Sequence, residues 1–365
     1  MVMSSPMRSF GNSSVLVVFF ILINRAVAAD LSSLVEDGVV PEPNLCSRSD
    51  PAMDPFYEVR YGQDVVWQIP SNPKAVLLMA HGMDKDPFCY FDSGPNCRQC
   101  YGLPENRGAV LAALDRNYAV ILVKSVNRYY LPWDVEVWPP PPSEDRFNVI
   151  SIIQEWTKEH FLDHLPLAAF GYSSGGNFST LLTVDLDFKS LILMCTPGEV
   201  LALVNANASF PPTLFLDMPV DTTYSSMAAS GRNLLETKGV RTGMIDIVPR
   251  PISPLNFTEK IPCLQRETAE LIYRAYKAES WLDDDDYVTM NPIVVDPEPV
   301  LWKHHVLPFC QSENDLCLAQ HVLQEINVAY AFHSFSSQFN QQIFDWLDYT
   351  VFHGSSEPAG LWRSQ

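Results

Sequence analysis

The stretch LPLAAFGYSSGGN at residues 165–177 decides the fold of this 365-residue chain. An apolar run of strand length ends in a Gly-x-Ser-x-Gly pattern, and the helix-like run FSTLL follows at residues 178–182. A serine at a sharp strand-to-helix turn needs very small residues two positions before and after it, and Gly171 and Gly175 supply them around Ser173. Glycine-rich turns without any chemistry also show this pattern. The flanking strand and helix patterns favour a nucleophile elbow, with Ser173 as the nucleophile.

The chain around this elbow alternates between apolar runs of strand length and longer amphipathic stretches from residue 75 onward. The alternation predicts an α/β fold with a doubly wound, mostly parallel sheet and crossover helices. The predicted strands are 75–80, 118–126, 167–170, 190–196, 212–217 and 242–248. The predicted helices are 103–117, 144–161 and 222–239, and residues 56–69 are expected to add an antiparallel edge hairpin.

The stretch from residue 249 to about residue 324 does not continue this alternation. It is rich in proline and acidic residues and contains one predicted helix, 266–281. We interpret it as an insertion after the last core strand and as a candidate cap. Its acidic run at 283–286 lacks the spaced ligands of a calcium loop, so we expect a solvated turn there.

The N-terminal residues have the pattern of a secretory leader. Arg8 precedes an apolar run at residues 15–23, and the small residues Ala26-Val-Ala28 follow. This run is much shorter than the roughly 20 residues of a membrane-spanning helix, which argues against a signal anchor. We therefore predict a signal peptide at residues 1–28, a hydrolase domain at residues 29–365, and a secreted or luminal protein without a stable membrane span.

All eight cysteines follow the predicted leader, and an oxidising compartment would pair most of them. Cys195 is the exception, because its strand-like apolar surroundings are typical of a buried free thiol. Cys97 and Cys100 are expected in disulfides rather than in a zinc site, since no second ligand pair follows at a suitable spacing. Cys310 and Cys317 are expected to form a local disulfide. The remaining connectivity is open.

Three acceptor sequons, at Asn177, Asn207 and Asn256, predict a glycoprotein. Asn177 belongs to the helix behind the elbow and is expected to stay unmodified. The formal net charge of -19, with no basic stripe, excludes a nucleic acid as the expected partner.

A serine nucleophile needs a base and a carboxylate that orients the base. Asp221 lies on the loop after the strand 212–217 and is our predicted acid, with Asp217 at the strand end as the runner-up. His333 precedes the amphipathic stretch 339–349, which is expected to be the final helix, and is our predicted base. The chain order Ser, Asp, His supports this choice.

An oxyanion hole is predicted from two backbone N–H groups. The sequence His81-Gly-Met83 ends the first core strand, and its glycine allows a sharp turn. The N–H of Met83 is therefore expected to point at the developing oxyanion together with the N–H of Ser174. His81 itself is expected to be structural.

These residues together resemble the α/β-hydrolase superfamily over residues 75–347. Residues 81–83 resemble its oxyanion turn and residues 171–175 its elbow. The segments CRQCYGLPE at 97–105, NFTEKIP at 256–262 and LQEINVAYAFH at 323–333 are also similar to a poorly characterised plant-type group. One feature departs from the superfamily pattern, because roughly eighty residues separate the last strand from His333, so the insertion must fold back to deliver it.

The sequence thus predicts a carboxylesterase-like serine hydrolase that cleaves an ester or acyl bond of a small-molecule or acylated substrate through an acyl-enzyme. No cofactor or metal is implied. The aromatic residues of 129–142 are expected either to line the rim of the site or to pack against the insertion. Two alternatives remain: a serine peptidase of the prolyl-oligopeptidase type, and a non-catalytic ligand-binding protein of the same fold.

Overall fold

The computed structural model describes residues 52–83, 85–126, 133–135, 143–261, 264–292 and 316–354. The predicted signal peptide lies outside these residues, as do Cys310 and most of the aromatic stretch 129–142.

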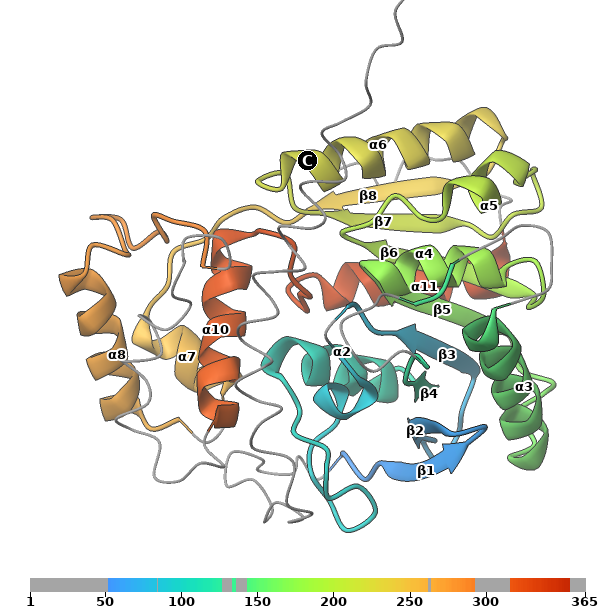
Figure 1. Cartoon of the computed structure of the whole chain (residues 1–365), viewed down its shortest axis with the longest axis horizontal. Helices are drawn as coiled ribbons and strands as arrows, with labels where there is room; N and C mark the ends of the chain where they lie inside the picture. Colours follow the sequence, from blue (N-terminus) through green and yellow to red (C-terminus); the bar gives the residue numbers. More distant parts are fainter. Residues whose placement is uncertain are drawn as a thin grey trace, which may run out of the picture.

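Eight strands form one sheet in the order β1-β2-β4-β3-β5-β6-β7-β8 (Figure 1). β1 pairs with β2 and β2 with β4 in the antiparallel sense, and all other neighbours are parallel. The bounds are β1 Phe56–Arg60, β2 Gln63–Gln68, β3 Ala75–Ala80, β4 Tyr118–Val123, β5 Leu167–Tyr172, β6 Phe188–Met194, β7 Thr213–Asp217 and β8 Thr242–Asp246. The predicted α/β class, core strands and edge hairpin are confirmed.

Helices cover both faces of the sheet, which explains why β3 and β4 are apolar at every position. Alternate side chains of a strand point to opposite faces. Leu77 packs in the cluster that contains residues of α2 and α11, whereas Leu78 packs with residues of α3 and α4. The bounds are α2 Pro104–Asp115, α3 Glu144–Glu159, α4 Ser174–Leu182, α5 Val200–Asn205, α6 Thr222–Thr237 and α11 Asn340–His353, with a 3₁₀ turn, η1, at Pro87–Tyr90.

The insertion forms a helical unit with its own apolar core, beside the sheet in Figure 1. Its helices are α7 Pro254–Lys260, α8 Arg266–Ala278 and α10 Leu316–Tyr330. Phe257, Ile272 and Val322, one from each helix, are fully buried together. The prediction of a single helix here is therefore wrong. The missed signal for α7 is a capping box, in which Ser253 and Asn256 each accept from the other's backbone N–H.

The acidic run in the insertion is a hydrogen-bonded turn against α8. Asp283 accepts the backbone N–H groups of Asp285 and Tyr287 at 3.0 and 2.9 Å. Asp286 pairs with Lys277 at 2.6 Å. The expected turn is found, and both carboxylates contact groups within the fold.

The states of Cys97, Cys100 and Cys195 agree with the sequence analysis, whereas that of Cys89 does not. Cys97 and Cys100 form a disulfide, which removes the zinc alternative for this pair. Cys195 is buried and unpaired, and Cys89 is a second buried free thiol. Cys46 and Cys263 lie outside the described residues.

The sheet order reverses between β3 and β5, which are parallel neighbours at the centre of the sheet. In such sheets the carboxyl ends of the strands at the reversal form the ligand site. Residues 81–83 follow β3 and Ser173 follows β5, so the topology places the predicted oxyanion turn beside the predicted nucleophile.

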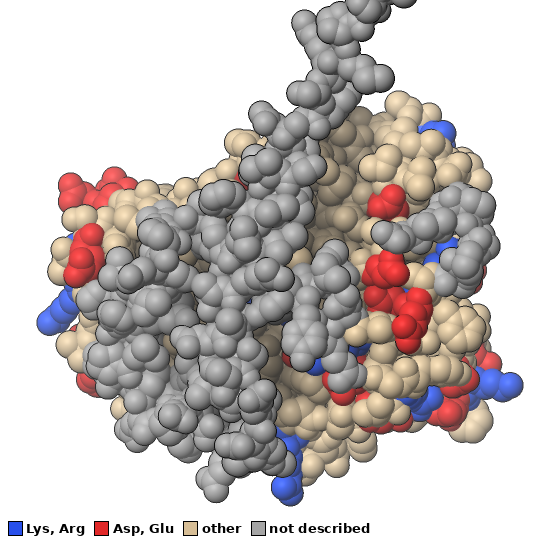
Figure 2. All heavy atoms as spheres, viewed as in Figure 1, with Lys and Arg blue, Asp and Glu red and all other residues tan. Residues whose placement is uncertain are grey.

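The described residues can be compared with the expectations about a membrane span and a nucleic-acid partner. No described helix combines the length and the apolar composition that a membrane crossing requires. On the face shown in Figure 2, the described Lys and Arg side chains are scattered among acidic ones rather than gathered in a stripe. The exclusion of a nucleic-acid partner stays a prediction.

Candidate active site

Ser173 occupies a strained turn between β5 and α4. Its φ of 52° and ψ of -120° are unusual for a residue with a side chain. A Cβ on Gly175 would collide with the carbonyl oxygens of Ala80 and His81, and one on Gly171 would lie 2.5 Å from the carbonyl oxygen of Gly175. The two glycines are therefore needed because β5, α4 and the end of β3 approach one another at van der Waals contact.

The three side chains selected from the sequence form one chain of hydrogen bonds. Ser173 Oγ lies 2.9 Å from Nε2 of His333, and His333 Nδ1 lies 2.9 Å from Oδ2 of Asp221. The side chains of His333 and Asp221 are only 11% and 7% exposed. Donation from Nδ1 to the carboxylate leaves the lone pair of Nε2 facing the serine hydroxyl, so the imidazole can accept the hydroxyl proton.

Asp221 is held in place by the helix that it starts. It is the N-cap of α6, and its Oδ1 accepts the backbone N–H of Tyr224 at 3.2 Å. Its two oxygens thus serve separate purposes, one as a helix cap and one toward His333. Asp217 lies at the end of β7 and accepts a hydrogen bond from the hydroxyl of Ser225. Burial raises the pKa of Asp217.

The turn after β3 touches the elbow directly. A Cβ on Gly82 would lie 2.6 Å from the ring of Tyr172 and 3.5 Å from Cβ of Ser173. Within the described part of the chain, the backbone N–H groups of Met83 and Ser174 donate to no protein acceptor. They are the donors that the sequence selects for an oxyanion.

The architecture is identified by an antiparallel first hairpin, a parallel core, a strained Gly-x-Ser-x-Gly turn after β5 and a buried aspartate after β7. The protein has the α/β-hydrolase fold.

The chain is similar to several solved structures at low sequence identity. No protein-family model and no curated protein matches the chain. Carboxyl esterase 2 from Tuber melanosporum is 17% identical over 70% of this chain and 98% of that chain, with a TM-score of 0.39. Dienelactone hydrolase from Anabaena variabilis is 16% identical over 53% and 86%, with a TM-score of 0.37. Acylaminoacyl peptidase from Pyrococcus horikoshii is 12% identical over 62% and 41%, with a TM-score of 0.39. The resemblance to a plant-type group stays a prediction.

The loop that carries His333 in this α/β-hydrolase fold is held by the ends of several strands. The hydroxyl of Tyr172 donates to the carbonyl of His333 at 2.8 Å. The backbone N–H groups of Ser334 and Ser336 contact the sulfur atoms of Met218 and Met194, each at 3.3 Å. The histidine comes from far along the chain but lies in an anchored loop, because the last residues of β5 and β6 and the residue after β7 all contact that loop.

His81 and Trp133 hold the turn at residues 81–83 through buried hydrogen bonds. His81 Nδ1 donates to the carbonyl of Gly82 at 2.8 Å, and its Nε2 accepts the backbone N–H of Ser125 at 3.1 Å. Burial lowers the pKa of His81 to about 4, so the ring is neutral at pH 7 and structural as predicted. Trp133 Nε1 donates to the carbonyl of His81 at 2.8 Å, and its ring stacks on Phe178.

Trp133 is the one aromatic residue of the stretch 129–142 that the structure describes. The aromatic residues were expected to line the rim of the site or to pack against the insertion. Trp133 does neither, because it is buried against the turn at residues 81–83. Tyr129, Tyr130 and Trp138 lie outside the described residues.

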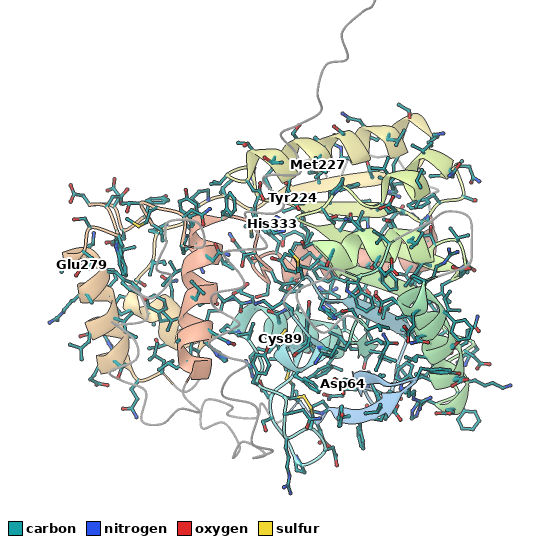
Figure 3. The ribbon with its side chains drawn as sticks, viewed as in Figure 1. Asp64, Cys89, Tyr224, Met227, Glu279 and His333 are labelled. Carbon is teal, nitrogen blue, oxygen red and sulfur yellow. A yellow bond between two sulfur atoms is a disulfide. The ribbon has the colours of Figure 1, made fainter. Side chains whose placement is uncertain are left out.

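Tyr224 is a site residue that the sequence analysis missed. Its ring lies 4.3 Å from the imidazole of His333, and the residue is 37% exposed. Figure 3 labels the two residues next to each other. Its place three residues after Asp221, one helical turn into α6, was the available signal. The ring covers one side of the imidazole and limits its access to water.

Proposed function

We propose that the protein is a serine hydrolase that cleaves an ester or acyl bond through an acyl-enzyme. The observation that carries the proposal is the unbroken contact from Ser173 Oγ through His333 to Asp221, with 2.9 Å at each step. The strained backbone of Ser173 supports it, and so do the backbone N–H groups of Met83 and Ser174, which have no described protein acceptor.

The proposed reaction begins when Ser173 Oγ attacks the carbonyl carbon of the substrate and passes its proton to His333 Nε2. Asp221 stabilises the imidazolium that forms. The N–H groups of Met83 and Ser174 hold the oxyanion of the tetrahedral intermediate. The leaving group then takes the proton from His333, and a water molecule activated by the same imidazole releases the acid and restores Ser173.

Covalent labelling with a fluorophosphonate probe tests this proposal. We expect one probe molecule per folded protein on the peptide that contains Ser173, and no labelling in Ser173→Ala, because the probe reacts only with an activated serine. Ser226→Ala is the matched control, since Ser226 is an exposed serine on α6. The measurement is gel fluorescence with mass spectrometry of the labelled peptide.

A well-folded wild-type protein that stays unlabelled would contradict the proposal and favour the non-catalytic, ligand-binding alternative. If labelling is seen, aryl esters and aminoacyl amides of the same acyl group separate an esterase from a peptidase. We expect turnover of the esters and slower turnover of the amides.

We further propose that the chain enters the secretory pathway, supported by the leader pattern and by the disulfide between Cys97 and Cys100. Asn207 is an exposed residue, whereas the amide of Asn177 accepts from Thr196 and that of Asn256 caps α7. On expression of the full chain in eukaryotic cells, we expect secretion with a glycan at Asn207.

Peptide N-glycosidase should therefore increase the gel mobility of the secreted wild type, and Asn207→Gln should already migrate at that position. Asn177→Gln is the control and should keep the glycan. A secreted protein without a mobility shift, or a shift that persists in Asn207→Gln, contradicts the prediction for this site.

A further inference from the structure

A buried carboxylate outside the proposed catalytic groups contacts the loop that carries His333. Glu105, in the first turn of α2, is 1% exposed. Its Oε2 accepts the backbone N–H of Ser337, four residues after His333. Its Oε1 lies 2.8 Å from Nζ of Lys260, at the end of α7 in the insertion. Lys260 also donates to the hydroxyl of Ser337 at 3.1 Å.

A second buried acid, Glu325 of α10, faces the same place and is also 1% exposed. Its Oε2 lies 3.3 Å from Arg250. Burial, followed by the charge of Glu105, raises the pKa of Glu325 well above its usual value. Burial acts to raise the pKa of Glu105 as well, but Lys260 and the N–H of Ser337 outweigh it and the net shift is downward. Each acid of this buried cluster has its own cation, Lys260 for Glu105 and Arg250 for Glu325.

Further contacts join α2 to the insertion and to the segment that follows His333. Gln324 of α10 accepts the backbone N–H of Glu105 at 2.9 Å and donates to Asn106 at 2.7 Å. Asn340, at the start of α11, donates to the carbonyl of Gly108 at 2.9 Å. A Cβ on Gly108 would lie 2.9 Å from the hydroxyl of Ser337, so α2 and the histidine loop are in close contact.

The position of the histidine loop therefore depends on charges from the insertion. A carboxylate as deeply buried as Glu105 is costly unless a cation and hydrogen-bond donors compensate it. Lys260 is its cation, and α7 brings Lys260 to the site. If the insertion left α2, Glu105 would lose this partner, and Ser337 would lose the hydroxyl contact to Lys260.

We propose that Glu105 is a positioning residue for His333: paired with Lys260, it fastens the histidine loop to the insertion, so that the imidazole reaches Ser173 while the insertion is docked. The inference rests on the proposed function and names residues through which that site is assembled. Glu105 touches no reacting atom, and it acts through Ser337.

The test compares Glu105→Gln and Lys260→Met with Glu267→Gln, which removes an exposed acid on α8. The readouts are the rate constant of fluorophosphonate labelling, kcat and KM on one ester, and the melting temperature. A small displacement of a catalytic group has a large effect on rate, so we expect the first two variants to lower the labelling rate and kcat by about 10- to 100-fold with KM nearly unchanged. Glu267→Gln should match the wild type.

The double variant Glu105→Gln/Lys260→Met adds a coupling test. Because the two residues act as one pair, its loss of rate should be smaller than the product of the two single losses. Glu325→Gln changes the neighbouring buried acid, which pairs with Arg250 rather than with Lys260, and it should retain far more activity than Glu105→Gln.

Two outcomes overturn the proposal. One is a Glu105→Gln protein that is less stable but is labelled at the wild-type rate per folded molecule, because the role of Glu105 would then be stability alone. The other is a double variant whose loss of rate equals the product of the two single losses. If the wild type is not labelled at all, the proposed function fails. The positioning role is then decided by the ¹³C ring signal of His333, which must change in Glu105→Gln and not in Glu267→Gln.

Discussion

Replacing His333 with alanine is expected to lower kcat for ester hydrolysis by about 10⁶-fold, with the fold intact. Ser173 Oγ would lose the base that lies 2.9 Å away, and a serine hydroxyl is a weak nucleophile without one. The oxyanion donors of Met83 and Ser174 remain in this variant, so some rate above the uncatalysed reaction should persist. Steady-state kinetics and circular dichroism on the purified variant check the result.

The matched control is His353→Ala, at the exposed end of α11, where Nδ1 of the ring contacts the carbonyl of Tyr349 at 3.1 Å. It should leave kcat within about twofold of the wild type, as expected for an exposed site away from the reaction. A loss of less than tenfold in His333→Ala would show that another group accepts the proton of Ser173, and the proposed mechanism would be wrong.

The second large effect is expected for Asp221→Asn, with a loss of about 10⁴-fold in kcat. Asparagine keeps the size and the helix cap, but its amide cannot stabilise the imidazolium. It also disturbs the tautomer in which Nδ1 donates toward residue 221 and Nε2 faces Ser173. The measurement is kcat at saturating ester, together with the labelling rate.

Asp217→Asn is the informative comparison, because both aspartates are buried near the end of β7 and only one contacts His333. Asp217 accepts from Ser225, so its variant should affect the melting temperature more than kcat. The opposite ranking of the two variants would assign the acid to Asp217, the runner-up from the sequence.

Local patterns predicted most of the fold, and their failures have local causes. The fully apolar β4 was predicted three residues too long, because the apolar Val126 follows soon after Lys124 and Ser125. The N–H of Val126 donates to Asp145 rather than to a neighbouring strand. β5 was predicted two residues too short, since Gly171 looks like a strand breaker. In the structure it still pairs with Leu193 of β6, because the elbow begins only after Tyr172.

The insertion was predicted only in part: the strongly amphipathic α8 was expected, whereas the seven-residue α7 and the longer α10 were not. The signal for α7 was the Ser253 and Asn256 capping box, and it was overlooked. The long separation between the last strand and His333 indicated only that the chain must fold back toward Ser173, and it did not predict α10. Packing supplies the reason for the return, because Phe257, Ile272 and Val322 bury one another.

The sequence by itself determined the succession of apolar runs along the chain, the elbow and the choice of Ser173 and Asp221, because these depend on short-range rules. His333 was chosen from the order Ser, Asp, His and from its place before the final helix. A glycine must stand where a Cβ would meet backbone, and catalytic groups follow the carboxyl ends of strands. Only the tertiary structure decided which distant groups meet. Glu105 lies in α2 and Lys260 lies in α7, and no local sequence pattern links the two residues. Their contact follows from the free energy of burying a charge, which requires a partner wherever the chain can supply one.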